Sequence, residues 1–251
     1  EVRRSLGLDK PVLSQFIVWV GQALRGDLGN SLQSGRPALK ELMERFPVTL
    51  ELTIYAGLIS IMAGVPVGIL SAIRQDSLLD NVLRFFAILA LAVPGFWLGL
   101  MVIILPSVWW DASPPITYIP FNKDVLGNLV QMTAPALTLG LASAATVMRM
   151  MRTTLLEVLR QDYIRTAWAK GLHEGLIVTR HALRPAFIPV ITILGIQFGY
   201  LLGGAVITET VFSLPGIGRL TTFAIMNKDY TIVQASVLIF SLTLWVKYDR
   251  M

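Results

Sequence analysis

Hydrophobic residues in this 251-residue chain gather into long stretches that are separated by polar segments. A helix needs about 20 mostly apolar residues to cross the roughly 30 Å hydrocarbon core of a bilayer. Four stretches are long enough, and a fifth is short and ends at Lys247 as if truncated: 48–73, 82–110, 133–151, 185–212 and 232–246. The pattern predicts an all-α membrane protein with about five spans.

Basic residues are distributed unevenly among the segments that join these stretches. The segment 149–184 holds seven Arg and Lys residues against three Asp and Glu, whereas 111–131 holds a single basic residue, Lys123. Because cytoplasmic loops are rich in Lys and Arg, 149–184 is predicted to be cytoplasmic and 111–131 external. Alternation of the spans then places the C-terminus in the cytoplasm.

The same alternation places residues 1–47 outside, although they contain seven Arg and Lys residues. The charge rule is weak for a segment of this length, so we predict an extracytoplasmic segment over 1–47. Apolar residues recur every three or four positions from Leu13 to Leu24, which predicts a helix lying on the membrane surface. An external segment also requires a further span upstream of it in the full-length protein.

Composition excludes most enzymatic chemistry. The chain is 54% hydrophobic and 15% charged, and it has no Cys, so neither disulfides nor thiolate sites exist. Its two histidines, His173 and His181, both lie in the predicted cytoplasmic loop, and no HExxH or GxxxxGK[ST] motif occurs. The net charge of +5 resides in loops between spans. We therefore expect no enzyme, metal site, bound cofactor or nucleic-acid partner.

Ionisable residues are also absent from the centres of the predicted spans, since Glu51, Arg84 and Glu209 lie toward span ends. A charge at the bilayer centre costs at least about 2.5–3.5 kcal/mol and usually marks a proton or ion relay. Their absence favours a transporter that is driven from outside the membrane. A carrier or channel that works without ATPase subunits remains the alternative.

The predicted cytoplasmic loop 152–184 contains one helical pattern. Apolar residues from Leu155 to Ala167 keep helical spacing as far as Lys170, and Gly171 follows as a stop signal. The pattern predicts an amphipathic helix whose small residues, Ala167 and Ala169, let a partner approach closely. On the pattern alone, a solvated connector is equally consistent.

The loop also resembles a known motif. Arg165-Thr166-Ala167, then Gly171, then nine residues and His181-x-Leu183-Arg184 are similar to the E-A-A-x-x-x-G-x9-I-x-L-P loop of permease subunits of binding-protein-dependent ABC importers. Arg replaces Glu, and the proline is displaced by one position to Pro185. Both departures resemble the dipeptide, oligopeptide and nickel branch, and so do Ser77-x-x-Asp80, Pro94-x-Phe96-Trp97 and the run 208–220.

The resemblance covers nearly the whole chain and is to the first permease of the pair. It implies a type I importer transmembrane domain over 48–251 in a bacterial or archaeal plasma membrane, with a sixth, N-terminal span missing. It also implies a second homologous permease, two ATPase subunits that carry ATP and Mg, and an extracytoplasmic binding protein. The solute would be a peptide or similar small hydrophilic molecule, and which one stays open.

The same resemblance assigns candidate site residues. The helix that docks on the ATPase would comprise Asp162, Tyr163, Arg165, Thr166, Ala167, Ala169, Lys170, Gly171 and Leu172. Contact with the binding protein, or an outer gate, is assigned to Glu209, Pro215, Gly216 and Gly218. For Pro215, Gly216 and Gly218 a structural turn is equally consistent, and for Glu209 the alternative is a side chain that extends to the membrane interface. Pro94, Phe96 and Trp97 are candidates for lining the path, although packing is the commoner role of such residues.

Overall fold

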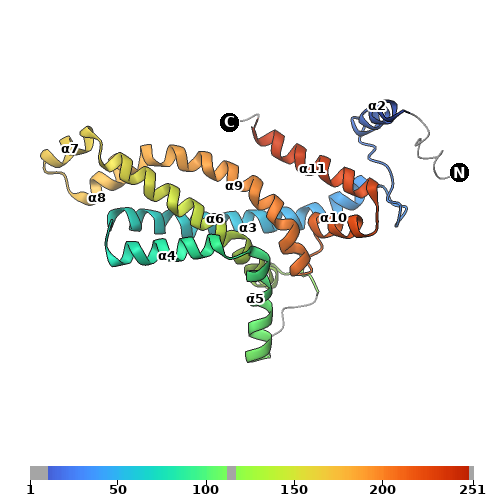
Figure 1. Ribbon diagram of the computed structural model, residues 1–251, viewed down its shortest axis with the longest axis horizontal. Coiled ribbons are helices and arrows are strands. Elements are labelled where there is room, and N and C mark those ends of the chain that lie inside the picture. Colours follow the sequence, from blue (N-terminus) through green and yellow to red (C-terminus); the bar gives the residue numbers. More distant parts are fainter. Residues whose placement is uncertain (1–10, 112–116, 249–251) are drawn as a thin grey trace. The chain divides into compact units, whose positions relative to one another are not determined.

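The computed structural model describes residues 11–111 and 117–248. Within these ranges the regular structure is helical, apart from an isolated bridge between Asn30 and Pro37. In chain order the helices are α2 (Val12–Ala23), α3 (Ala38–Ile73), α4 (Leu78–Ala92), α5 (Gly95–Trp110), α6 (Val125–Leu159), α7 (Asp162–Ala169), α8 (Glu174–Leu176), the π-helix η1 (Ile177–Ala182), α9 (Leu183–Val211), α10 (Ile217–Met226) and α11 (Tyr230–Tyr248) (Figure 1). The prediction of an all-α chain is confirmed.

Three helical segments among the described residues are long and apolar enough to cross a bilayer: α3, α6, and the run Glu174–Val211 that joins α8, η1 and α9. The apolar stretch 82–110, predicted as one span, is instead two helices, α4 and α5, bent by 98°. The break falls at Val93, which has extended backbone, because the following Pro94 disfavours helical geometry in the residue before it. The bent pair makes a fourth crossing if it is one span, and the apolar part of α11 is shorter.

The chain divides into two compact units. Unit 1 joins the described residues up to Val48 to those from Pro215 onward, and its core brings Leu28 and Leu42 against Ile217 and Ile232. In the loop before α11, buried Asp229 accepts a hydrogen bond from the Ser31 hydroxyl. Burial alone would raise the pKa of Asp229, but hydrogen bonds from Ser31 and from backbone N–H groups outweigh it and hold this pKa below its usual value.

Unit 2 comprises residues 49–214 and holds α4 to α9 with most of α3. Glycines permit close packing of α3 on α6. A Cβ atom added to Gly64 would lie 2.6 Å from the carbonyl oxygen of Ala144, and one added to Gly68 would lie 2.7 Å from that of Met148. Small residues at this spacing let helix backbones approach each other in membranes.

This close approach gives a matched pair of substitutions in one helix. Gly64→Ala is expected to lower the free energy of unfolding by about 1–3 kcal/mol, because the new methyl group overpacks the contact with α6. Gly57→Ala would place its Cβ 3.7 Å from the nearest side chain, an ordinary contact, and is expected to be neutral or slightly stabilising. Thermal unfolding of both variants in detergent tests this, and equal melting temperatures would contradict the packing assignment.

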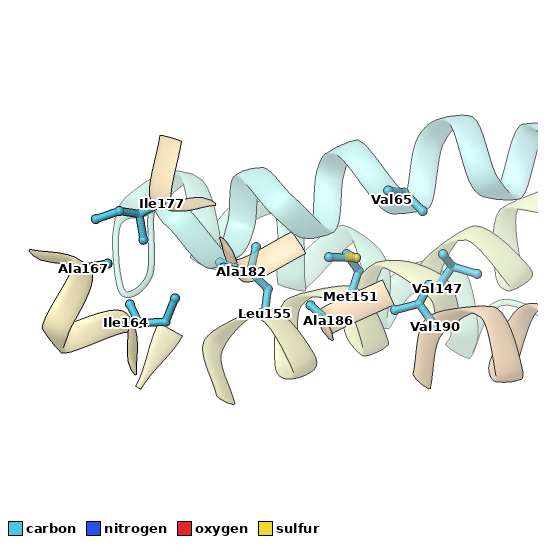
Figure 2. Packing of buried hydrophobic residues seen from close by; sticks show 11 residues of the cluster. Val65, Val147, Met151, Leu155, Ile164, Ala167, Ile177, Ala182, Ala186 and Val190 are labelled. Carbon is cyan, nitrogen blue, oxygen red and sulfur yellow. The ribbon is translucent and has the colours of Figure 1, made fainter. Parts of the chain in front are cut away.

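One end of unit 2 holds a continuous hydrophobic cluster, which we call the end cluster. It gathers buried residues of α3, α6, α7, η1 and α9: Val65, Ala72, Val147, Met151, Leu155, Ile164, Ala167, Ile177, Ala182, Ala186 and Val190 (Figure 2). The end cluster therefore binds the short helix α7 to the ends of α6 and α9.

Candidate functional site

Helix α7 is separate from α6. The sequence predicts one helix from Leu155 to Lys170, but α6 ends at Leu159, and Gln161 has extended backbone. A continuous helix would place Ile164 about 13 Å beyond Leu155 along the axis. Both side chains are instead fully buried in the end cluster, so the turn at Arg160–Gln161 folds α7 back onto it.

The predicted glycine stop is confirmed. Gly171 has a φ of +76°, a left-handed conformation that glycine adopts without steric cost. Its N–H donates to the carbonyl of Trp168 at 2.9 Å, and the N–H of Leu172 donates to the carbonyl of Ala167 at 3.3 Å. This pair of hydrogen bonds is the Schellman motif, which ends a helix and satisfies its last carbonyl groups.

The buried side of α7 consists of Ile164 and Ala167, which Figure 2 shows directed toward Ile177 and the end of α6. The sequence assigns Ala167 to the surface that a partner approaches. The structure corrects this, because Ala167 is only 8% exposed and packs on the chain's own end cluster. The signal for burial was the helical spacing of Ala167 with the apolar residues that begin at Leu155.

The outward side of α7 is a mixed surface, which we call the α7 face. Asp162, Arg165, Thr166 and Ala169 share one stripe at helical spacing, and all four are exposed. Tyr163 and Trp168 flank the stripe and are about half exposed, and Lys170 and Gly171 extend it. Arg165 forms an exposed ion pair with Asp162 at 3.3 Å. Of the predicted docking residues, only Ala167 and the partly buried Leu172 lie off this face.

Beside the end cluster lies a buried ion pair that the sequence did not reveal. Asp80, in the first turn of α4, is completely buried. Arg152 of α6 donates two hydrogen bonds to its carboxylate, from Nε at 2.9 Å and from Nη2 at 2.7 Å. The carboxylate also accepts from the Ser71 hydroxyl on α3 and from the N–H of Asp76 at 3.1 Å. This network joins three helices at one point.

A local signal for part of this network does exist. Ser77 is the N-cap of α4, and its hydroxyl accepts from the N–H of Asp80 at 3.2 Å. The Ser-x-x-Asp spacing is thus a helix-start pattern close to a capping box. The pairing with Arg152 spans 72 residues, and the sequence places Arg152 in the loop 152–184 rather than inside α6, so no local pattern predicts it.

A second polar cluster ties the start of unit 2 to the loop before α6. The hydroxyl of Tyr118 donates to the Glu51 carboxylate on α3 at 2.9 Å. Gln131 and Asn128 of α6 hold the backbone of the same loop through Thr117 and Ile119. Burial and the hydrogen bond to Glu51 together raise the pKa of Tyr118 well above its usual value. This cluster lies at the opposite end of α6 from α7.

Comparison with known proteins identifies the family of proteins to which this chain, with its buried ion pair and its exposed α7 face, belongs. Residues 64–247, which include the whole of α4 to α10, match the family of the binding-protein-dependent transport system inner membrane component. The chain belongs to this family. It is therefore a permease subunit of an ABC importer, which is a translocation component and not a catalytic enzyme. The family implies that this permease works with an ATPase and a substrate-binding protein.

Curated relatives of this permease are similar over most of their length. The dipeptide transport system permease protein DppB of Escherichia coli (strain K12) is 39% identical, over 93% of this chain and 76% of that one. The glutathione transport system permease protein GsiC of Pectobacterium atrosepticum is 40% identical, over 96% and 76%. The probable peptide ABC transporter permease protein y4tP of Sinorhizobium fredii is 37% identical, over 96% and 77%.

Solved structures confirm the fold of this permease. A chain of the MetNI methionine ABC transporter in an inward-facing conformation matches with a TM-score of 0.68 at 18% identity, over 84% of this chain and 92% of that one. A chain of an amino acid ABC transporter matches with a TM-score of 0.63 at 16% identity, over 84% and 90%. The predicted type I importer fold is thereby confirmed.

The permease places the candidate path residues at the bend between α4 and α5. Pro94 is the N-cap of α5 and exposed. Phe96 and Trp97 in the first turn of α5 are 52% and 49% exposed. Packing into the core is the commoner role of such residues, but these two are not packed into the core of unit 2. Their role in lining a path stays a prediction.

The candidate gate residues belong to both units of the permease. Glu209, in the last turn of α9 in unit 2, is completely buried. Pro215, Gly216 and Gly218 lie in unit 1 where α10 begins, and the two glycines are buried. The glycines therefore offer no exposed surface in this structure, while Pro215 is partly exposed. A role of these four residues in gating or binding-protein contact stays a prediction.

Proposed function

We propose that this permease takes up a peptide or a similar small hydrophilic solute by alternating access. Its relatives are named for dipeptide, glutathione and peptide transport, which supports this class of solute. A second homologous permease completes the path, an extracytoplasmic binding protein delivers the solute, and two ATPase subunits supply the energy. The permease lies in a bacterial or archaeal plasma membrane. The segment that contains α7 is on the cytoplasmic side, and so is the C-terminus, as the charge distribution favours.

The observation that carries the mechanism is the two-sided character of α7. One side is exposed and contains Tyr163, Trp168 and Arg165, residue types that are enriched at protein interfaces. The other side is anchored by Ile164 and Ala167 in a cluster that includes residues of α6 and α9 (Figure 2). An ATPase subunit docked on the α7 face would therefore move these long helices with it.

The physical basis of this coupling is close packing. Packed interiors transmit displacement as rigid-body motion because their side chains have little room to yield. Closure of two ATPase subunits on ATP thus shifts α7, and the end cluster carries the shift to α6 and α9. The Asp80–Arg152 pair extends the rigid assembly to α4 and α3.

Uptake into proteoliposomes tests the function. The complete importer is reconstituted with its binding protein, and radiolabelled dipeptide is added outside, with ATP or a non-hydrolysable analogue inside. We expect accumulation against a gradient only with hydrolysable ATP. Equal transport with the analogue would favour the alternative, a carrier or channel that works without ATPase subunits. Absence of dipeptide uptake together with dipeptide-independent ATP hydrolysis would point to another solute.

A further inference from the structure

Unit 2 contains a cavity of about 510 Å³ between α4, α6 and α9. Three arginines line it, Arg84 from α4 and Arg149 and Arg152 from α6, together with the hydroxyl-bearing Thr146. Ile88 and Ile193 form an apolar wall. ATPase docking does not use this cavity, and the proposed coupling uses one of its lining residues, Arg152, through its pair with Asp80.

Positive charge exceeds negative charge around the cavity. Within the described part of the chain, the ion pairs of these arginines are all with the Asp80 carboxylate, to which Arg152 donates two hydrogen bonds. Arg84 lies 3.9 Å from the same carboxylate, beyond hydrogen-bond distance. Among the residues that the structure describes, no carboxylate pairs with Arg149. Arg84 and Arg149 are both exposed, and neither guanidinium group is held by a hydrogen bond to a carboxylate among the described residues.

The sequence indicates how deep in the membrane these arginines lie. Residues 125–148 of α6 contain no Asp, Glu, Lys or Arg, and Arg149 is the first charged residue after them. At 1.5 Å per residue this stretch is about 36 Å long, enough to cross the roughly 30 Å hydrocarbon core. Residues 85–110 are likewise free of charge, so Arg84 also lies at the edge of an apolar region. The arginines are therefore at the level of the membrane interface.

We propose that this cavity binds an oxyanion, a phosphate or a carboxylate group, with Arg149 and Arg84 as its ligands. The planar guanidinium group suits such groups because it donates two parallel hydrogen bonds. Asp80 holds Arg152 in place and acts as a positioning residue. The apolar wall accommodates the carbon chain attached to the oxyanion. Such a group reaches the interface on an anionic phospholipid or, if the proposed function holds, on the C-terminus of a transported peptide.

Arginine modification tests the proposal in the complete importer. The complex in nanodiscs is treated with an arginine-selective dicarbonyl reagent, and modification of each arginine is followed by peptide mass spectrometry. Nanodiscs of phosphatidylcholine are compared with nanodiscs that also contain phosphatidylglycerol, and diglycine is compared with diglycine amide, which lacks the carboxylate. We expect the modification rate of Arg149 to fall about tenfold when the phosphatidylglycerol or diglycine that binds the cavity is present. A guanidinium group that forms charge-assisted hydrogen bonds to an oxyanion is less accessible to the reagent.

The arms separate the two sources. Protection by phosphatidylglycerol alone identifies a lipid site, and protection by diglycine but not by its amide identifies a solute site. Arg74, exposed after α3 and outside the cavity, should react at one rate throughout. If Arg149 reacts as fast as Arg74 in every condition, the proposal is overturned, whatever the outcome of the uptake experiment.

A pair of variants gives an independent readout. Arg149→Gln should lower the amount of phosphatidylglycerol or diglycine retained in native mass spectrometry about tenfold, and Arg74→Gln, with the same charge change, should not. Arg149 forms no ion pair within the described part of the chain, so Arg149→Gln removes no internal partner. Equal retention by the two variants would contradict the assignment.

Discussion

Arg152→Leu should lower the free energy of unfolding of this permease by about 3–5 kcal/mol, the cost of leaving a buried carboxylate without its charged partner. Asp80 is completely buried, and Arg152 supplies both of its side-chain N–H donors. In the variant, the Ser71 hydroxyl and the Asp76 N–H remain, and Arg84 stays 3.9 Å away. These groups do not replace a two-point contact with a guanidinium group.

The chain offers a control one turn away. Arg149→Leu makes the same substitution on the same helix, at a position with no carboxylate partner among the described residues, and should change stability by less than about 1 kcal/mol. Denaturant or thermal unfolding in detergent compares the two variants. Similar stability of both would show that the buried pair contributes little.

A double variant separates the lost ion pair from lost packing. Because replacing both members of a buried pair is often nearly neutral, Asp80→Asn combined with Arg152→Leu should recover much of the loss caused by Arg152→Leu alone. The recovery measures the coupling between the two residues. If the double variant is as unstable as the sum of its single variants, the stabilisation comes from independent contacts.

Ala169→Trp should abolish ATP-driven uptake while leaving the permease folded. Ala169 is exposed on the α7 face, at the last residue of α7, and an indole ring there would hold a docked protein away. A bulky side chain on the docking surface prevents close packing with the partner, so we expect at least about a tenfold loss of ATPase association. Co-purification of the ATPase with the permease measures the association, and proteoliposome uptake measures its consequence.

Two further variants make this result specific. Asn122→Trp adds the same side chain at an exposed site in the loop before α6, at the opposite end of that helix, and should leave both readouts unchanged. Ile164→Ala creates a cavity under α7 without altering its outward face. It should preserve ATPase association but reduce the uptake per ATP hydrolysed. Normal uptake by the Ala169→Trp variant would show that α7 is not part of the surface on which the ATPase docks.

Sequence alone determined the features of this protein that depend on local pattern. The number of apolar stretches, their length and the uneven distribution of basic residues set the membrane class. Gly171 marked the end of α7 because its φ of +76° is a local requirement that glycine meets best. The spacing from Arg165 to Leu183 indicated the importer family, since it is a pattern within one segment.

Tertiary structure decided the features that depend on residues far apart in the chain. It turned the chain at Gln161 so that Ile164 joins Leu155 in the end cluster, and it buried Ala167, which the sequence had assigned to the surface that a partner approaches. It also joined Asp80 to Arg152 across 72 residues. Periodicity fixes which residues share a face of one helix, whereas the neighbour that covers this face is chosen by the packing energy of the whole unit.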